Sequence, residues 1–499
     1  MEIEAKREIV SILMSKGTLV NRETLGQLDA IQNINSFKSL LLQESGAINL
    51  QELIKKSQET KKEDPLPPIG TRGNVSVTFS YKAEPKKRDV QDFVSYFAAR
   101  YNALKAILQN RKELQSPTSI NRLNQKREKE QIAIIGLISD KQETKTGKIM
   151  LTAEDPTGKI KIVVSPNTDA YAMAKETSLD EVVGIVGTSG GEIIFASNIV
   201  LPDIPLYTEV KKSPDEAYAL FMGDFHFGSK VFLTEAFEKF MSWIRGEQGS
   251  EDQKDIASKI KYLFMVGDIV EGVGIYPDQD QDLTITDIYD QYKEFSNYLK
   301  RIPQHIQIII CPGNHDAMRL SEPQPPLYKD FAEAVWNLPN VYMTSNPAQI
   351  NIHASKDFPG FDVLLYHGFS FTHYADSVES IRSKGGQERV DLIMQYLLQR
   401  RHLAPTHTST LYLPDAQKDN LVIDKIPDFF VTGHIHRVSA SNYKSVTMLS
   451  CSCWLEKTEY QEKVGLHPQP GRAILVNLQT RKAKILKFYD DPEEKQEKT

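Results

Sequence analysis

Five short blocks of this 499-residue sequence combine carboxylate, amide and imidazole side chains with glycine. They are GDFHFG (223–228), GDIVEG (267–272), GNHD (313–316), YHG (366–368) and GHIHR (433–437). The metal-binding donors that they supply are Asp224, His226, Asp268, Asn314, His315, His367, His434 and His436. A mixture of oxygen and imidazole donors favours Mn²⁺, Fe²⁺ or Zn²⁺ over Mg²⁺ and Ca²⁺. The number of donors predicts a centre with two metal ions.

The spacing of donors within two blocks supports this prediction. Asp224 and His226 stand two residues apart, as do His434 and His436. Side chains at such spacing project to the same side of an extended backbone, so each pair can address one metal cluster. Two neighbouring dications attract a phosphodiester and activate water near neutral pH. The constellation therefore predicts hydrolysis of a phosphate ester.

The elements that must position these blocks are apolar strands. The blocks terminate the runs AYALFMGD, KYLFMVGD, IQIIICPGNHD, VLLYHG and DFFVTGHIH. Buried strands that end in polar loops, with helices between them, place active sites at the carboxyl ends of the strands. We expect an α/β domain of this kind over residues 203–499.

Three segments precede the predicted barrel and the catalytic domain. Residues 1–56 carry apolar residues at helical spacing and predict a small helical module. Residues 57–74 are rich in charges, proline and glycine, which predicts a flexible linker. Residues 75–128 predict a strand and a long amphipathic helix (89–111) that lead into the next domain.

Short strands at close spacing fill residues 129–202 and predict an OB-type β-barrel. Such a barrel either docks another protein or binds a single nucleic-acid strand. Base stacking requires aromatic faces, and this segment holds only Tyr171 and Phe195. We therefore favour protein docking.

Composition limits the classes of partner. Lys+Arg 60 against Asp+Glu 66 gives a net charge of −6, so nucleic acid must be held by a local patch or by metals. Three cysteines are too few for a disulfide framework and fit a reducing compartment; Cys451 and Cys453 are expected to be buried thiols. No apolar run reaches the ~18 residues that span a bilayer, and the first residues do not resemble a secretion signal. We expect an intracellular, soluble protein.

In this order, the five blocks resemble those of the calcineurin-like metallophosphoesterases, over residues 217–480. The resemblance implies a β-sandwich flanked by helices. It implies two divalent ions, with Mn²⁺ favoured and Fe²⁺ or Zn²⁺ as alternatives. The first would be held by Asp224, His226, Asp268 and His436, and the second by Asp268, Asn314, His367 and His434, with Asp268 bridging. His315 would remain unliganded and protonate the leaving oxygen, with Asp316 as its orienting residue. The sequence leaves open whether Arg437 contacts substrate phosphate or a neighbouring carboxylate.

Two departures narrow the choice within that superfamily. Protein phosphatases typically have arginine after the second-block aspartate, whereas Asp268 is followed by Ile269, Val270 and Glu271. Repair nucleases begin with the catalytic domain, whereas about two hundred residues precede it here. A barrel followed by a phosphoesterase domain is similar to the small, B-type subunits of replicative DNA polymerases, above all those of archaeal family D. The segments DFVSYFAARYNALKAIL, GDIVEGVGIYPDQ and LHPQPGRAILVNL carry that resemblance, and Glu271 stands where related archaeal sequences often have aspartate.

This resemblance implies a 3′→5′ proofreading exonuclease that forms a heterodimer with a large catalytic polymerase subunit. Its substrate would be single-stranded or frayed 3′ ends of DNA, and its place the cytoplasm, at the nucleoid. A sliding clamp or another replication factor would be the partner of the amino-terminal module. The alternative is a catalytically silent scaffold, as in eukaryotic B subunits that have lost their metal ligands. Retaining buried carboxylates and imidazoles without metals costs roughly several kcal/mol, which favours the enzyme.

Overall fold

The structure is a computed structural model of the whole chain. It describes residues 3–15, 20, 24, 26, 28, 37, 41, 73–82, 86–114, 116–123, 129–206, 208–415, 417–463 and 465–490. The chain divides into two compact units, residues 1–69 and 70–499. No helix within the described ranges is long and apolar enough to cross a membrane.

The first unit contains helix α1 (Ile3–Ser15). Its residues Ile9 and Leu13 are buried together with Leu28, Phe37 and Leu41. Helix α1 and this apolar cluster lie within residues 1–56, and the prediction of a helical module over that range stays a prediction. The rest of that module, and residues 57–72 of the predicted linker, lie outside the described residues.

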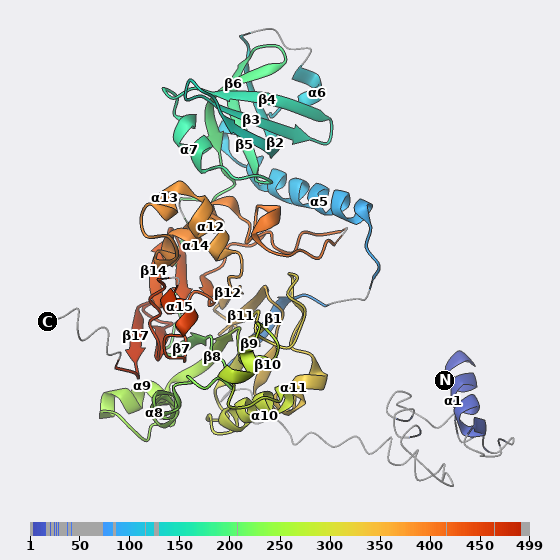
Figure 1. The fold of residues 1–499 in the computed structure, drawn as a ribbon, viewed down its shortest axis with the longest axis vertical. Helices are drawn as coiled ribbons and strands as arrows, with labels where there is room; N and C mark the ends of the chain where they lie inside the picture. The colour runs from blue at the N-terminus through green and yellow to red at the C-terminus, as the bar shows by residue number, and fades with distance from the viewer. Residues whose placement is uncertain are drawn as a thin grey trace. The chain divides into compact units, whose positions relative to one another are not determined.

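A closed five-stranded barrel forms where short strands were predicted (Figure 1). Its elements are β2 (Gln131–Glu143), β3 (Ile149–Asp155), β4 (Gly158–Val164), α7 (Ala170–Glu176), β5 (Val182–Ser189) and β6 (Ile193–Val200). The strands follow the order β2-β3-β4-β6-β5, and β5 pairs with β2 to close the barrel. Alternate side chains such as Ile134, Ile162 and Ile185 fill the interior, as the period of two in the sequence requires.

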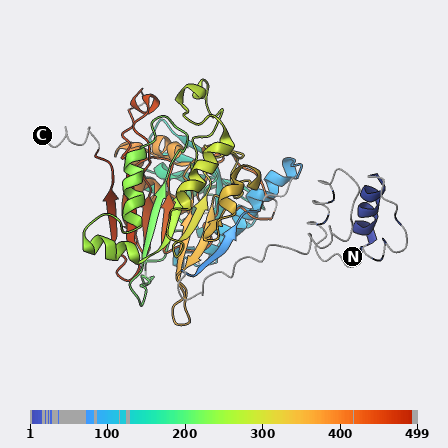
Figure 2. The ribbon, with the colours of Figure 1, turned by 90° about the horizontal axis from the view of Figure 1, so that it is seen from below.

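Two six-stranded sheets form the largest part of the second unit (Figures 1 and 2). The first has the order β10-β9-β8-β7-β16-β17 and contains β7 (Tyr218–Gly223), β8 (Ile260–Val266), β9 (Gln307–Cys311), β10 (Val341–Met343), β16 (Arg472–Asn477) and β17 (Ala483–Lys487). The second has the order β1-β11-β12-β13-β15-β14 and contains β1 (Val75–Ser80), β11 (Ala348–Ile352), β12 (Phe361–Leu365), β13 (Phe429–Thr432), β14 (Ser439–Tyr443) and β15 (Val446–Ser450).

Helices cover the outer face of each sheet. Helices α8 (Thr234–Ile244), α9 (Glu251–Ser258), α10 (Ile288–Leu299) and α11 (Lys329–Trp336) accompany the first sheet, and α12 (Phe371–Ser377), α13 (Glu379–Arg382) and α14 (Val390–Arg400) the second. Leu220 and Met222 of β7 pack in the helix-facing core, whereas Ala219 and Phe221 pack against the other sheet. The predicted mixed α/β architecture is therefore confirmed as a helix–sheet–sheet–helix sandwich. The remaining short elements are η2 (Lys112–Leu114), α6 (Ile120–Leu123), η3 (Gln279–Asp282), η4 (Gly386–Glu388), η5 (His407–Ser409) and α15 (Glu459–Lys463).

Strand β1 belongs to the sandwich, although it precedes the barrel in the sequence. It pairs antiparallel with β11, and the carbonyl oxygen of Asn74 accepts a hydrogen bond from the backbone N–H of His353 at 2.9 Å. We expected residues 75–128 to lead into the barrel and the catalytic domain to begin at residue 203. That boundary is too late for the sheet, because strand pairing across more than 260 residues leaves no local pattern in the sequence.

Helix α5 (Val90–Leu108), within the predicted helix 89–111, is attached to the sandwich by a buried ion pair. The Nε atom of Arg100 lies 2.7 Å from Oδ2 of Asp419, and both side chains are fully buried. Buried polar contacts with α14 also attach the barrel to the sandwich. Glu181 accepts hydrogen bonds from Tyr396 at 2.6 Å and from Arg400 at 3.1 Å. Buried pairs of this kind tolerate desolvation only when their geometry and partners are complete.

Replacing Arg100 with methionine is expected to destabilise the sandwich strongly. The substitution leaves the Asp419 carboxylate buried without its cation, a change that typically costs about 3–5 kcal/mol. Denaturant unfolding followed by tryptophan fluorescence measures this loss, because all three tryptophans lie in the sandwich. The matched control is Arg389→Met, which breaks the exposed pair with Asp391 and should cost less than about 1 kcal/mol. Equal losses of unfolding free energy in the two variants would show that the buried Arg100–Asp419 pair matters no more than an exposed one.

The same cluster predicts a dependence of stability on pH. Burial, together with the charge of Arg100, lowers the pKa of His402 to about 4. An unfolded histidine titrates near pH ~6.5. Between about pH 6.5 and 4, His402 is therefore protonated in the unfolded chain and still neutral in the folded chain. This contribution to stability is complete above pH ~6.5 and falls by roughly 1 kcal/mol per pH unit on acidification. The slope of unfolding free energy against pH should be shallower in His402→Gln than in the unsubstituted chain, and identical slopes would refute the prediction.

Candidate metal centre

The five blocks lie at the carboxyl ends of five strands. Strands β7, β8 and β9 run parallel in the first sheet, and β12 and β13 run parallel in the second. Their last residues precede Asp224, Asp268, Asn314, His367 and His434 by one to three positions. The expected placement of the blocks at strand ends is therefore confirmed, and each sheet supplies part of the site.

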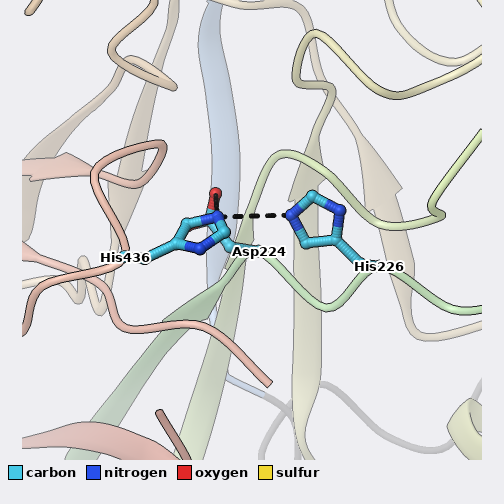
Figure 3. Close-up of side chains that lie close together, drawn as sticks. All are labelled: Asp224, His226 and His436. Atoms are coloured by element: carbon cyan, nitrogen blue, oxygen red, sulfur yellow. Dashed lines mark hydrogen bonds and ion pairs between the residues drawn. The ribbon is translucent and has the colours of Figure 1, made fainter. Parts of the chain in front are cut away.

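One cluster of donors contains Asp224, His226 and His436, whose ligand atoms all lie within 4.8 Å of one another. The Nε2 atoms of the two imidazoles are 3.3 Å apart, and Nε2 of His436 lies 3.6 Å from Oδ1 of Asp224 (Figure 3). All three side chains are buried. These are the three residues, with Asp268, expected to hold the first metal.

A second cluster contains Asp268, His367 and His434, also within 4.8 Å. Nε2 of His367 lies 3.3 Å from Oδ2 of Asp268 and 3.0 Å from Oδ1 of Asn314. The same Oδ2 atom of Asp268 lies 3.8 Å from Nε2 of His226, in the first cluster. Asp268 thus stands between the two clusters, where the predicted bridging ligand is expected. The seven expected ligands are gathered in one place, while their binding of metal stays a prediction.

Five of these seven residues have left-handed backbone conformations. The φ angles are 51° for Asp224, 55° for His226, 47° for Asp268, 70° for His434 and 58° for His436. Such angles are uncommon outside glycine and typically cost about 1–3 kcal/mol each. Strained residues of this kind cluster at functional sites, because they persist only where side chains must be held close together.

Glycine makes the close approach of ligands possible at two positions. Gly267 has φ 74°, and a Cβ atom there would lie 2.1 Å from Nδ1 of His367. A Cβ atom at Gly313 would lie 2.2 Å from Oδ1 of Asp268. Any side chain at either position would displace a donor from the cluster.

The hydrogen bonds of His367 test whether the donors fit a cation. Its Nδ1 atom contacts the carbonyl oxygen of Val266 at 3.2 Å, and since a carbonyl only accepts, Nδ1 carries the proton. Nε2 then turns its lone pair toward the Asp268 carboxylate, which also only accepts. Burial by itself lowers the pKa of His367, but the charge of Asp268 outweighs it and raises this pKa to about 9. Either a proton or a cation must fill the space between these acceptors, so the residues fit a divalent ion.

Two neighbouring groups, His434 and Asp268, have the protonation states that metal binding requires. Burial, reinforced by His367, lowers the pKa of His434 to about 3, so its imidazole is neutral. Burial alone would raise the pKa of Asp268, but His367 and the other imidazoles lower it well below its usual value. A neutral imidazole and an ionised carboxylate are the forms that bind divalent cations.

His315 is oriented by Glu271, not by Asp316. Its Nδ1 atom lies 2.9 Å from the carbonyl oxygen of Glu271, so Nδ1 carries the proton and Nε2 is the nitrogen that exchanges one. The Asp316 carboxylate instead accepts from the backbone N–H of Gly313 at 2.8 Å and the hydroxyl of Tyr292 at 3.0 Å. Burial, then the charge of Asp268, raises the pKa of Asp316 to about 7. The prediction that Asp316 orients His315 is wrong, since adjacent residues in the chain need not direct their side chains to the same place.

Two residues of the site were missed by the sequence analysis. Oε2 of Glu271 lies 2.9 Å from Nδ1 of His226, an ion-pair distance without the alignment of a hydrogen bond, while Nε2 of His226 faces His436 of the first cluster. Nε2 of Gln461, on α15, lies 2.9 Å from Nδ1 of His436. Glu271 could have been found as the second carboxylate of its block, whereas Gln461 follows in a segment without any motif.

The structure also decides two smaller points. Nη1 of Arg437 donates to the carbonyl oxygen of His467 at 2.7 Å and lies 3.6 Å from Oε1 of Glu388, which favours the carboxylate alternative. The three cysteines are buried and unpaired, as expected for Cys451 and Cys453.

Comparison with known proteins relates the sequence of this chain to polymerase subunits. The family model that describes the B subunit of DNA polymerases alpha and epsilon matches residues 219–440. The DNA polymerase II small subunit of Methanothermobacter thermautotrophicus is 37% identical over 390 residues, which cover 78% of this chain and 78% of that protein. The corresponding protein of Pyrococcus furiosus is 36% identical over 403 residues, 80% of this chain.

The chain spans 64% of the length of the Pyrococcus furiosus relative and 63% of that from Pyrococcus abyssi. Among solved structures, asparaginyl-tRNA synthetase from Pyrococcus horikoshii is 17% identical over 17% of this chain and 22% of that one, with a TM-score of 0.16. A likeness of that size carries no argument about the fold.

Replacing Glu271 with glutamine should weaken metal binding without unfolding the chain. The substitution removes the negative charge that lies 2.9 Å from Nδ1 of His226, and loss of such an outer partner typically lowers metal affinity about ten- to hundredfold. Titration calorimetry with Mn²⁺ measures the change, and Glu251→Gln, on the surface of α9, is the control. Unchanged affinity in Glu271→Gln would show that the contact with His226 does not position the ring.

Proposed function

Because this chain belongs to the family of archaeal DNA polymerase II (family D) small subunits, we propose that it is a metal-dependent 3′→5′ exonuclease that proofreads for a large polymerase subunit. In this proposal the metal centre hydrolyses the DNA. The barrel-and-sandwich architecture and the large polymerase subunit as partner are those that the family suggests. Polymerase small subunits that act only as scaffolds have no need of a metal site, so the state of the site decides between the two roles.

One observation carries the proposal: seven donors from five separate blocks are gathered into two adjoining clusters, and five of them have strained backbone. A surface that only docks another protein gains nothing from this arrangement. Five of the seven donors are buried and two, Asn314 and His434, are half-buried, and ligand atoms of the two clusters approach one another to 3.3 to 3.8 Å. Two cations held among them would be bound by these crowded oxygen and nitrogen atoms.

The chain's own residues would divide the work as follows. Asp224, His226, Asp268 and His436 would hold one ion, and Asp268, Asn314, His367 and His434 the other. When bound, the two ions supply positive charge at the phosphate and make water acidic enough to attack near neutral pH. The backbone N–H of His315 donates to Oδ1 of Asp268 at 2.8 Å, which fixes the loop beside that carboxylate.

The proton for the leaving oxygen would come from Nε2 of His315. Nδ1 is held by its hydrogen bond to the Glu271 carbonyl, which leaves Nε2 free to transfer a proton. The side chain is 19% exposed, so Nε2 can reach both substrate and solvent. General acids of this kind typically contribute about 10²–10⁴-fold to the rate. Selection of errors would come from fraying, since a mispaired 3′ end separates from its template more readily and enters the site as a single strand.

We assign the barrel to the OB type and the sandwich to the metallophosphoesterase type. Strand order β2-β3-β4-β6-β5 with a parallel β4–β6 pair supports the first assignment, because the OB barrel is a five-stranded Greek key. Two facing sheets with helices outside and donors at the strand ends support the second.

A docking role for the same chain is supported by the exposed side of α5. Val90, Phe93 and Val94 are 80%, 36% and 55% exposed on that helix. Apolar side chains gathered on one helix typically mark a protein interface. The large polymerase subunit is the partner that the family suggests, so enzyme and scaffold are compatible roles.

Purified chain with Mn²⁺ is expected to shorten single-stranded DNA from its 3′ end, and His315→Ala should lower the rate about 10²–10⁴-fold with metal still bound. Loss of the proton donor slows the departure of the leaving oxygen but removes no ligand. Gel analysis of 5′-labelled and 3′-labelled oligonucleotides gives both rate and direction, and metal analysis of the same samples gives occupancy. His407→Ala is the control, because that histidine is exposed and outside both clusters.

Two outcomes would overturn the proposal. Undiminished cleavage by His315→Ala would mean that the nuclease is a contaminant or uses another acid. Far fewer than two metals per chain after incubation with Mn²⁺ would favour the silent scaffold.

A further inference from the structure

A short loop beside the metal centre presents apolar side chains to solvent. Val273, Ile275 and Tyr276 are 48%, 40% and 39% exposed, within four residues of chain. Apolar surface held in water is unfavourable, and such patches on folded proteins typically bind something. Residues 273–276 are called the apolar loop below.

The apolar loop is exposed although hydrogen bonds hold its backbone in place. Two buried glutamines hold its backbone. Gln279 accepts from the N–H of Ile275 at 2.9 Å and donates to the carbonyl of Glu271 at 3.1 Å. Gln291 accepts from the N–H of Gly272 at 3.0 Å and donates to its carbonyl at 3.2 Å. These bonds fix the loop in the conformation that exposes its side chains.

The apolar loop adjoins the residue proposed as the general acid. A Cβ atom at Gly272 would lie 2.4 Å from the carbonyl oxygen of His315 and 2.8 Å from Cγ1 of Ile275. The Ile275 side chain therefore covers Gly272 next to His315. Tyr276 is the next residue along this exposed loop.

We propose that Ile275 and Tyr276 bind the unpaired terminal base of a DNA strand whose last phosphodiester lies at the metal centre. This inference rests on the proposed function and adds the group that holds the base. An aromatic ring and a branched aliphatic side chain offer a base an apolar face, which accepts any of the four bases. Such a contact favours a base that has left its pair, because a paired base is already stacked in the duplex.

The residues after the apolar loop favour a strand end over a strand interior. Asp278, Asp280 and Asp282 are exposed, and the hydroxyl of Tyr276 donates to Oδ2 of Asp282 at 3.1 Å. Their carboxylates repel phosphates, so a strand that continued past Tyr276 would meet unfavourable charge. A terminal nucleotide has no further phosphate to be repelled.

Binding of a fluorescent oligonucleotide tests the proposal without cleavage. The probe is a single strand with 2-aminopurine at its 3′ end and a phosphorothioate last linkage, since stacking quenches 2-aminopurine. With the full chain and Mn²⁺, we expect quenching, and Tyr276→Ala should remove it and weaken binding about five- to hundredfold. Tyr276→Phe should restore both, because the ring is kept. Circular dichroism verifies that each variant is folded.

Two matched comparisons separate base binding from other effects. Phe195→Ala removes a ring of similar exposure, 47%, from the barrel, and should leave quenching unchanged. An oligonucleotide without its terminal base should bind the unsubstituted chain and Tyr276→Ala equally well. Equal quenching by the unsubstituted chain and Tyr276→Ala, or a loss seen only in Phe195→Ala, would refute the proposal.

The outcome distinguishes this proposal from the exonuclease itself. Quenching that depends on Tyr276, in a chain that cleaves no DNA, would support the base site and refute the nuclease. Cleavage with unchanged KM and rate in Tyr276→Ala would support the nuclease and refute the base site. If Tyr276→Ala weakens assembly with the large subunit and leaves binding of the probe unchanged, the loop is a protein interface and the proposal is wrong.

Discussion

The structure depends on a crowding of imidazole nitrogens and carboxylate oxygens at one place between the two sheets. Nδ1 of His367 donates to the Val266 carbonyl and Nδ1 of His226 lies 2.9 Å from the Glu271 carboxylate, so Nε2 of each ring faces the interior of the site. Oδ2 of Asp268 lies between them, at 3.3 and 3.8 Å. A lone pair facing a carboxylate in a buried space is repulsive, and only a proton or a cation removes the repulsion. The left-handed backbone of five donors and the glycines beside them keep these groups together.

The two-sheet architecture is the means by which the crowding is maintained. The first cluster takes Asp224 and His226 from the end of β7 and His436 from beyond β13, which lies in the other sheet. The second takes Asp268 from the first sheet and His367 from the second. A slip of one sheet along the other would separate both clusters at once. The apolar core between the sheets therefore sets the distances at the site, and the buried pairs that attach α5 and the barrel lie outside it.

Local patterns in the sequence were sufficient for the strands, the long helix and the donors, because each of these depends on residues close together in the chain. They were insufficient wherever a contact joins distant segments. Strand β1 pairs with β11 across the whole barrel, and Gln461 approaches His436 from a segment without a motif. The assignment of Asp316 failed for a related reason: its neighbour in the sequence, His315, turns toward Glu271, while Asp316 turns toward Gly313 and Tyr292. Side-chain direction in a loop is set by such contacts and has no periodic signature.

The magnitude of the strain bears on whether the site is active or inherited. Five left-handed residues at about 1–3 kcal/mol each amount to a cost comparable with the whole stability of a typical domain, about 5–15 kcal/mol. A chain that only docked its partner would gain stability from ordinary residues at these positions, and mutation would readily supply them. The site instead keeps donors at all seven positions, glycine where a Cβ atom would strike a ligand, and a glutamate against His226. Such a combination favours the proposed metal centre over a silent scaffold, because the strain would be offset by the two cations that the donors are expected to hold, and the proposed hydrolysis of a DNA end would use those cations.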